Sequence, residues 1–188
     1  MSSSRAKIVA AVRASQPAPL PLPAVPEFTG PASVADFSAV LTAIGGRVVV
    51  LDGLPQLAEV LGQLFPANYL LASAMLPATL PVTSDTPIDR LAAVELAVLR
   101  AAFGVAENGT VWLPEANMLH RALPTITQHL VLVLDQRNLV ATMHQAYAQV
   151  TDVGGYGMFL AGPSKTADIE QSLVIGAHGA RSLTVLLH

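Results

Sequence analysis

The residues best suited to chemistry lie near the carboxyl end of the chain, in Gly162-Pro163-Ser164-Lys165-Thr166. Apolar residues 158–161 precede them, and a strand is expected to end here because proline cannot donate a hydrogen bond within a sheet. Ser164 or Thr166 then caps a helix, since a hydroxyl accepts a hydrogen bond from an amide two or three residues later. Free amides at the start of such a helix, together with the Lys165 ammonium, favour an anion such as a phosphate or a carboxylate.

The same turn also has a purely structural interpretation. Asp168 and Glu170 fall in the first turn of the predicted helix, where the helix dipole favours negative charge. The two hydroxyls then do no more than cap the helix, and the two carboxylates oppose tight binding of a polyanion. The residues alone leave both interpretations open.

A second candidate is Glu107, which lies beside a predicted hairpin. Strand-like runs flank Asn108-Gly109, and this dipeptide supplies the two positive-φ residues of a type I′ turn. Glu107 either acts as a nucleophile that forms an acyl intermediate or merely flanks the turn. No motif nearby indicates a coenzyme A site, which favours the structural interpretation.

Among five histidines, His178 is the best placed for chemistry because Gly176 and Gly179 bracket it. An imidazole exchanges protons near neutral pH, so His178 is either a general acid or base or a side chain bonded to the backbone at a tight corner. The other histidines are expected to be structural or solvated: His120, His129, His144 and His188. Their spacing predicts no metal site.

Composition excludes several classes of function. The chain has 188 residues and no cysteine, which excludes disulfides, catalytic thiolates and cysteine-bound zinc or iron–sulfur clusters. A formal net charge of −3 argues against nucleic acid as a partner. The chain is 52% hydrophobic, yet no run approaches the ~20 apolar residues of a membrane span. We therefore expect a single cytoplasmic domain over residues 1–188.

Residues 1–32 differ in character from the rest of the chain. Residues 2–15 predict a short helix that packs on the domain. Six prolines follow between residues 17 and 31, and their spacing favours an extended, polyproline-like backbone. We interpret this segment as a tether over the surface, and the alternative is a docking segment for a proline-binding partner.

The remaining periodicities predict an α/β fold. Helices are predicted at 33–44 with Ser33 as the cap, from Pro55 onward and at 139–150, and strands at 48–51, 69–71, 129–135 and 183–187. Helices that alternate with strands predict parallel βαβ units, and hence a three-layer α/β/α domain with a mostly parallel central sheet. Ligands of such sheets bind beyond the carboxyl ends of the strands.

Two motifs carry a resemblance to a known family. Residues 162–170 read G-P-S-K-T-A-D-I-E and residues 173–179 read L-V-I-G-A-H-G, while residues 106–110 read A-E-N-G-T. Residues 162–170 and 173–179 together resemble the C-terminal signature of the LUD (lactate utilization) domain family, and within it the lactate utilization C group. Residues 106–110 are similar to the family's A-E-T-G-T. The family usually has proline where this chain has Ala180.

This resemblance implies the NagB/RpiA/CoA-transferase-like fold, with a strand at 93–98 and a tight turn of helix at 99–102. It implies an accessory, non-redox component of a three-protein system that oxidises L-lactate to pyruvate, with iron–sulfur clusters carried by partner proteins. The contribution of this chain is then either assembly of the system or binding of a carboxylate, and its residues indicate no catalytic step of its own. It also implies a small carboxylate or phosphate ligand, held by Gly162, Ser164, Lys165, Thr166, Asp168, Gly109 and Thr110.

Two kinds of enzyme with the same fold are the alternatives. One is an acyl transferase resembling coenzyme A transferases, with Glu107 as the acyl acceptor. The other is a ligase resembling 5-formyltetrahydrofolate cyclo-ligase, with a nucleotide at the Gly162 turn. The binding hypotheses share one expectation, namely that the helix after Ser164 opens into a crevice lined by Glu107 and His178.

Overall fold

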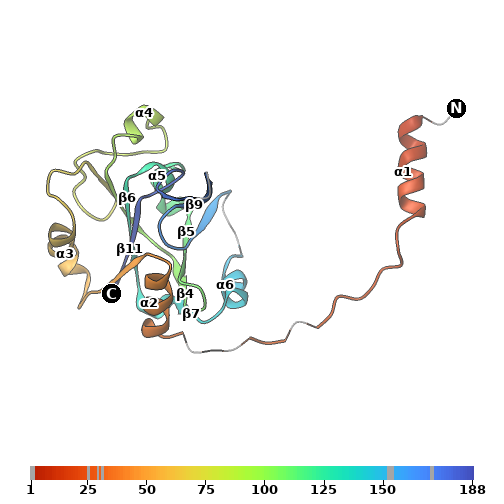
Figure 1. Ribbon diagram of the computed structural model, residues 1–188, viewed down its shortest axis with the longest axis horizontal. Helices are drawn as coiled ribbons and strands as arrows, with labels where there is room; N and C mark the ends of the chain where they lie inside the picture. The colour runs from red at the N-terminus through yellow and green to blue at the C-terminus, as the bar shows by residue number, and fades with distance from the viewer. Residues whose placement is uncertain (1–2, 25, 29, 31, 152–154, 170–171) are drawn as a thin grey trace.

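A five-stranded parallel sheet forms the centre of the computed structural model, which describes residues 3–24, 26–28, 30, 32–151, 155–169 and 172–188 (Figure 1). Its strands are β1 (Arg47–Val50), β2 (Leu71–Ser73), β3 (Leu96–Arg100), β6 (His129–Leu134) and β11 (Ser182–Leu187), in the order β1-β11-β6-β3-β2. The inner strands are continuous apolar runs, as expected where both faces of a parallel sheet are covered. The predicted α/β class with a mostly parallel central sheet and flanking helices is confirmed.

One face of this sheet packs against α3 (Leu57–Leu64), which follows the 3₁₀ turn η1 (Leu54–Gln56). Leu57 and Leu61 point inward at helical spacing and join a buried cluster with Val131, Val133 and Leu186. The helix ends before Phe65-Pro66, because the residue before a proline disfavours helical backbone. The helix predicted from Pro55 onward therefore forms where it was expected.

The other face packs against α2 (Val34–Ala43), α5 (Leu123–Ile126) and a second sheet. The Ser33 hydroxyl caps α2 as predicted, accepting a hydrogen bond from the Asp36 amide at 3.0 Å. Phe37 and Leu41 are fully buried on the inner side of α2. The largest apolar cluster of the described chain therefore lies between the two sheets.

The second sheet has four strands and was not predicted as a sheet. It consists of β4 (Phe103–Val105), β5 (Thr110–Pro114), β7 (Leu139–Val140) and β8 (Gly157–Leu160), in the order β7-β4-β5-β8. Its outer face carries α6 (Met143–Gln149) and a cluster of Phe103, Trp112 and Phe159. Trp112 and Phe159 have ring centroids 4.5 Å apart. Helix α6 begins later than the predicted residue 139, because residues 139–140 pair with β4 and Thr142 forms a capping box with Gln145.

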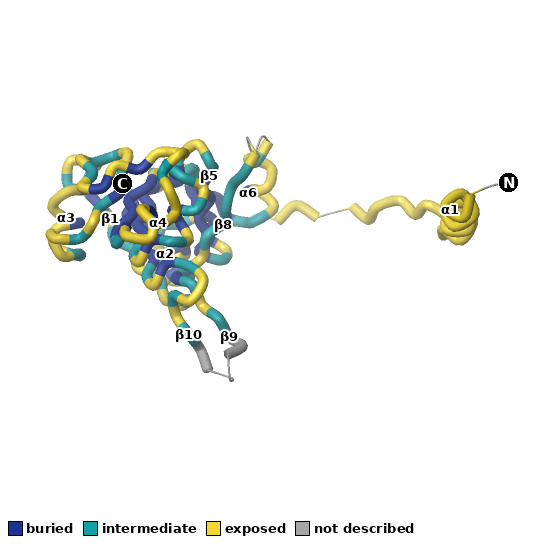
Figure 2. The backbone as a smooth tube through the Cα atoms, turned by 90° about the horizontal axis from the view of Figure 1, so that it is seen from above, coloured by how far each residue is buried: buried dark blue, intermediate teal, exposed yellow. Residues whose placement is uncertain are grey.

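The predicted helix after Ser164 is wrong. An antiparallel hairpin stands in its place, formed by β9 (Lys165–Ile169) and β10 (Ser172–Ile175), and it projects from the body of the molecule (Figure 2). The Ser164 amide donates to Ala180 O at 2.9 Å, and the Gly176 amide donates to Ser164 O at 3.0 Å, so the two ends of the hairpin are tied together. β-Branched residues such as Thr166 and Val174 suit a strand better than a helix. Glu170, the second predicted acidic residue of the helix, lies outside the described residues.

Two smaller predictions also need correction. Residues 99–102 do not form a turn of helix, because β3 continues to Arg100 in register with β6. The predicted hairpin at Gly109 is present, but β4 and β5 are joined by four residues, 106–109, and Gly109 has a φ of +69° whereas Asn108 does not have positive φ. A four-residue connection needs fewer left-handed residues than the predicted type I′ turn.

Short helical segments complete the connections: α4 (Ile88–Leu91), η2 (Glu115–Asn117) and η3 (Gln136–Asn138). In the part of the chain that is described, no helix has the length and apolar character needed to cross a membrane.

The amino-terminal helix α1 (Ser4–Ala14) lies far from the body, at the end of an extended proline-rich arm (Figure 1). No residue of α1 is buried, so the prediction that this helix packs on the domain is wrong. Leu20 and Leu22 on the arm are 86% and 93% exposed, and Phe28 stacks on His144 at 4.4 Å. Residues 1–24 carry three cations and no acid, which leaves a formal charge of −6 on the rest of the chain.

Candidate functional site

Two pockets flank the amino end of β11, one on each face of the central sheet. Side chains alternate along a strand, so Ser182 and Thr184 face α3 while Leu183 faces the second sheet. We call the cavity on the α3 face the His129 pocket and the cavity on the other face the Gly162 pocket. The crevice was predicted at the carboxyl ends of the strands, and both of these pockets instead lie at the amino ends.

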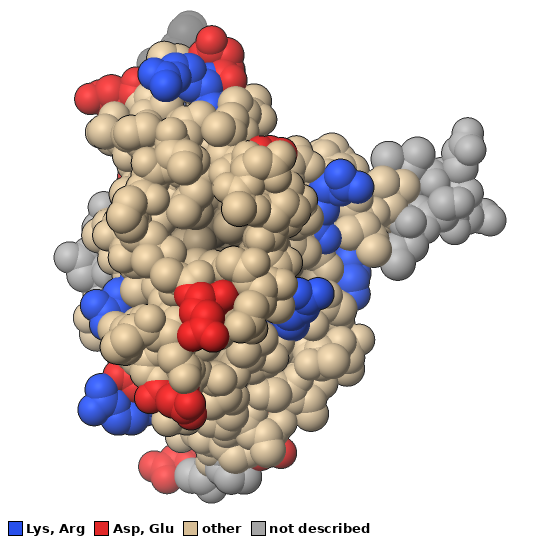
Figure 3. Space-filling model, turned by 90° about the vertical axis from the view of Figure 1, so that its left-hand side faces the viewer, with Lys and Arg blue, Asp and Glu red and all other residues tan. Residues whose placement is uncertain are grey.

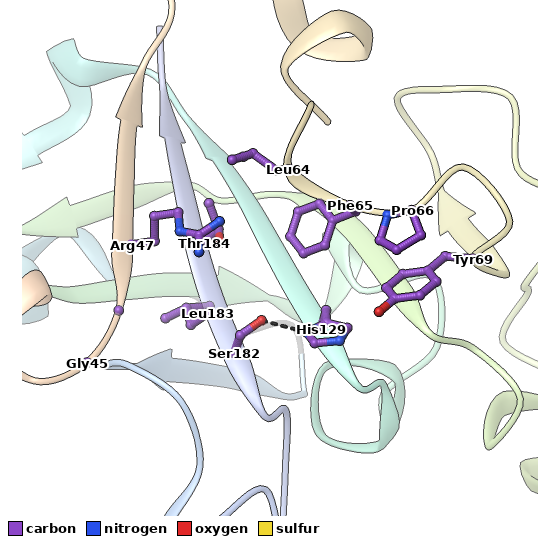
Figure 4. A pocket seen from close by; sticks show the side chains of 11 residues that line it. Gly45, Arg47, Leu64, Phe65, Pro66, Tyr69, His129, Ser182, Leu183 and Thr184 are labelled. Carbon is purple, nitrogen blue, oxygen red and sulfur yellow. Dashed lines mark hydrogen bonds between the residues drawn. The ribbon is translucent and has the colours of Figure 1, made fainter. Parts of the chain in front are cut away.

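The His129 pocket has a volume of about 330 Å³. It is built from polar residues of three neighbouring strands and from aromatic residues after α3: Arg47, His129, Ser182, Thr184, Phe65 and Tyr69. Arg47 pairs with Thr184, and Ser182 pairs with His129, so the parallel register places all four polar side chains on one face (Figure 4).

His129 is held by contacts on two sides. Its Nδ1 atom is hydrogen-bonded to Ser182 Oγ at 2.7 Å, with the donor set by the histidine tautomer. The Tyr69 ring stacks on the imidazole at a centroid distance of 5.5 Å and an angle of 8°, and Phe65 lies at 5.7 Å. The ring is therefore fixed in orientation before any ligand arrives.

The electrostatics of this pocket favour an uncharged His129. Burial lowers the pKa of His129 below its ordinary value, the positive charge of Arg181 lowers it further, and the Glu95 carboxylate acts in the opposite direction. Glu95 also accepts a hydrogen bond from the Leu70 amide at 2.9 Å. The lining cation of the pocket is therefore Arg47, and the imidazole serves as a neutral hydrogen-bonding group.

The Gly162 pocket, of about 300 Å³, brings together four of the residues singled out in the sequence. Gly162, Ser164, Lys165 and His178 all line it, beside apolar residues of β8 and the start of β11. Lys165 Nζ donates a hydrogen bond to Ile44 O, which ties β9 to the end of α2. Thr166 lies in β9 and is not among the lining residues, and the backbone of Asp168 belongs to the same strand.

The cradle of free amides expected at Ser164 does not form. The Ser164 amide is bonded to Ala180 O, and the helix that was to supply further amides is a strand. Polar recognition in the Gly162 pocket therefore falls to side chains, namely the Lys165 ammonium, the Ser164 hydroxyl and the exposed His178 imidazole.

Glu107 lies apart from this pocket and has a structural contact. Its Oε2 atom accepts a hydrogen bond from the Met143 amide at 2.8 Å, so the carboxylate caps the start of α6. A Cβ at Gly109 would lie 2.9 Å from the Leu41 backbone, and Thr110 is 6% exposed. The expected crevice shared by Glu107 and His178 is therefore not formed. Gly109 packs against α2, and Thr110 is buried.

The other histidines make contacts within the fold. His120 Nδ1 accepts from the Ala122 amide at 3.0 Å, and His144 stacks on Phe28. His188 Nε2 is buried and lacks a hydrogen-bond partner among the described residues. Within those residues, no group of three histidine or acidic side chains is arranged to hold a metal ion.

An ion pair lies at the carboxyl end of β6, between the largely exposed Arg137 side chain and the mostly covered Asp135 carboxylate. Arg137 donates two hydrogen bonds to Asp135 Oδ2, at 2.5 and 3.1 Å. These bonds hold the pKa of the Asp135 carboxyl well below its usual range.

Sequence reasoning missed the His129 pocket and treated His129 as structural. Ser182 is 53 residues away in the chain, and Arg47 lies on a third strand. One signal was present, since His129, Arg47 and Ser182 are polar residues at the first position of strands that are otherwise apolar or nearly so. Parallel strands that start at the same edge bring their first residues together.

Comparison with known proteins gives a family. The family model described as the LUD domain matches residues 83–188, which is more than half of the chain. A lactate utilization protein C from Shouchella clausii is 31% identical over 102 residues, which cover 51% of this chain and 44% of that protein. The lactate utilization protein C of Geobacillus kaustophilus is 28% identical over 147 residues, or 74% of this chain and 61% of its own length.

The chain spans less than two thirds of the length of these relatives. Among solved structures, a DUF162 family protein from Deinococcus radiodurans is 18% identical and superposes with a TM-score of 0.62, over 82% of this chain and 94% of that one. That likeness shows a common fold. The family model and the fold agree, and the chain belongs to the LUD domain family.

Proposed function

We propose that this chain is a cytoplasmic, non-redox component of a lactate utilization system in which partner proteins carry the iron–sulfur clusters. Membership of the LUD domain family is the observation that carries the proposal, together with relatives named lactate utilization protein C. The absence of cysteine supports a non-redox role, because thiolates are the usual ligands of iron–sulfur clusters.

The ligand of this component is a small carboxylate such as lactate or pyruvate, bound in the Gly162 pocket. Lys165 supplies a positive charge, and Ser164 and His178 supply hydrogen-bonding groups on the same cavity wall. Gly179 brings Ser164 close, since a Cβ at Gly179 would lie 3.1 Å from Ser164 Cβ. A pocket of this size accommodates a ligand of a few heavy atoms together with water.

Acyl transfer through Glu107 has weaker support. A carboxylate that accepts a hydrogen bond from the Met143 amide is a helix cap, and attack on a thioester would require that bond to break. Ligation with a nucleotide at the Gly162 turn would call for phosphate-binding amides, and the Ser164 amide is already bonded.

The cellular role is tested by deleting the gene and growing the cells on L-lactate as sole carbon source. Growth should fail without the gene and return when the full-length chain is restored, while growth on glucose stays normal. Normal growth of the deletion strain on lactate would overturn the role. Affinity purification of the tagged chain from lactate-grown cells should recover iron–sulfur proteins.

The ligand is tested by calorimetric titration of the full-length chain with lactate, pyruvate, acetate and inorganic phosphate. We expect lactate or pyruvate to bind and Lys165→Met to weaken that binding about tenfold, because a charge-assisted hydrogen bond contributes roughly 1.5–3 kcal/mol. Arg13→Met, which removes a cation from α1, is the matched control and should bind like the wild type. Equal weakening by both variants would contradict the assignment of the Gly162 pocket.

A further inference from the structure

An apolar groove beneath α3 adjoins the His129 pocket. Phe65, Pro66 and Tyr69 line both cavities, so the two lie side by side and share a largely aromatic wall. We call the second cavity the Leu61 groove; it has a volume of about 330 Å³ and is formed by Leu61 and Gly62 of α3 with Leu71, Leu76 and Pro77. The pocket and groove together are larger than a small hydroxy acid requires and lie in the size range of sites for larger organic ligands.

The two ends of this composite cavity differ in chemistry. The strand end presents the Arg47 guanidinium and the hydrogen-bonded pair of His129 and Ser182. The groove end is lined mostly by carbon. Of the two lining residues with a hydroxyl, Tyr69 and Thr79, the hydroxyl of Thr79 accepts a hydrogen bond from the Leu71 amide at 2.7 Å. Figure 3 views the molecule from the side of α3 and shows a surface that is mostly neither acidic nor basic.

We propose that this cavity binds a medium-chain monocarboxylic acid, with its carboxylate at Arg47 and its alkyl tail in the Leu61 groove. A guanidinium is the preferred partner of a carboxylate, and among the described residues no side-chain hydrogen bond or salt bridge engages the Arg47 guanidinium, which lines the pocket. The pair of His129 and Ser182 offers a second polar contact to the same head group. The alkyl tail replaces water along Leu61, Leu71 and Leu76, which is the source of the affinity.

This site is separate from the one in the proposed function. It lies on the α3 face of the sheet, whereas the Gly162 pocket lies on the opposite face behind Leu183. Binding of the monocarboxylic acid can therefore be tested independently of lactate binding in the Gly162 pocket.

The test is calorimetric titration of the full-length chain with hexanoate, octanoate and decanoate below their micelle concentrations. Affinity should rise about two- to fourfold for each added methylene group, since each buried methylene contributes roughly 0.8 kcal/mol or less. Acetate has the head group alone and 1-octanol the tail alone, and both should bind at least tenfold more weakly than octanoate. Equal binding of octanol and octanoate, or no binding of the acids, would overturn the proposal.

Variants locate the site. A Cβ at Gly62 meets no atom within 4 Å, so Gly62→Leu places a side chain in the groove without disturbing the fold. Gln63→Leu adds the same side chain at the next, exposed position of α3 and serves as the matched control. We expect Gly62→Leu to weaken octanoate binding tenfold or more and Gln63→Leu to leave it unchanged. Equal effects of the two variants would contradict the assigned groove.

Arg47→Met tests the head group. It keeps the aliphatic stem and removes the charge, so octanoate binding should fall at least tenfold while octanol binding stays the same. Circular dichroism and thermal melting of each variant establish that it is folded. Unchanged octanoate affinity in folded Arg47→Met would show that the carboxylate is not held there.

Discussion

His129 owes its surroundings to strand register. The imidazole meets Ser182 because β6 and β11 run parallel and begin at the same edge, and it meets Tyr69 because the chain returns to that edge after α3. None of these neighbours lies near it in the sequence, so local patterns indicated a lone histidine at the start of a strand. Conversely, His178 and Ser164 belong to one stretch of the chain and both line the Gly162 pocket, whereas Glu107, which was expected beside them, lies at the start of α6.

A first prediction concerns the pH dependence of stability. Because burial and Arg181 hold the pKa of His129 below its ordinary value, the unfolded chain takes up a proton before the folded chain does. The free energy of unfolding should therefore fall as the pH drops below about 6.5, and this contribution is fully present above that pH. In His129→Gln the slope between pH 7 and pH 5 should be shallower than in the wild type. Urea denaturation at each pH measures both slopes, and parallel slopes would refute the prediction.

A second prediction contrasts two glycines. Gly109 has a φ of +69°, and an added Cβ would lie 2.9 Å from the Leu41 backbone, so Gly109→Ala should destabilise the fold by about 2 kcal/mol or more. Gly62 lies within α3 and has open space around it, so Gly62→Ala should stabilise the fold by about 0.5–1 kcal/mol. Urea midpoints measure both changes, and a shift in the same direction for the two variants would contradict this account.

At the scale of elements, the segment after Ser164 shows where periodicity fails. The pattern after Ser164 fits a helix, with capping hydroxyls, acidic residues in the first turn and apolar residues at helical spacing. A hairpin forms there instead. Short segments fit both templates, and the deciding bonds join Ser164 to Ala180 and Gly176, at the far end of the segment. By contrast, α2 and α3 have longer apolar faces with a cap or proline at their start, and they form as predicted.

A third prediction concerns the start of α6. Glu107→Ala removes the carboxylate that accepts from the Met143 amide and should lower the free energy of unfolding by about 1 kcal/mol. Thr142→Ala breaks the capping box at the same helix end and should cost about as much. Chemical denaturation measures the free energy of unfolding of both single variants and of the double variant. The double variant is included because the two caps act on one helix end, so their effects need not add. If Glu107→Ala leaves stability unchanged, the carboxylate is not a structural cap and its role as a reactive group regains support.

At the scale of the whole molecule, most of the central sheet was predictable and the second sheet was not. Strands β6 and β11 are short runs of mostly buried apolar residues, a pattern that predicts strands in a covered parallel sheet. The run that contains β3 fits a helix as well as a strand by its periodicity, and the strand was expected there only from the family resemblance. The second sheet uses strands of two to five residues whose order, β7-β4-β5-β8, joins segments far apart in the chain. Such pairings depend on the packing of the two sheets against each other, which no local pattern encodes.

A fourth prediction follows from the exposure of the arm. Helix α1 buries no residue, and the first residue of this region to stack on the body is Phe28, on His144. Deletion of residues 1–24 should therefore leave the melting temperature within about 1 °C, because a change under 0.3 kcal/mol produces no larger shift in a domain of this size. Differential scanning calorimetry of the two chains measures the difference. A clear drop would show that α1 does pack on the body in solution.

The proline-rich arm also affects the hydrodynamic size of the protein. An extended proline-rich segment advances about 3.1 Å per residue, so the stretch from residue 15 to residue 32 spans roughly 50 Å. Because the arm holds the cationic helix α1 at that distance from the body, the protein has a much larger frictional coefficient than a sphere of equal mass. In gel filtration the chain should elute ahead of a compact 19.6 kDa standard, and a more dilute buffer should draw the cationic end toward the anionic body and delay its elution.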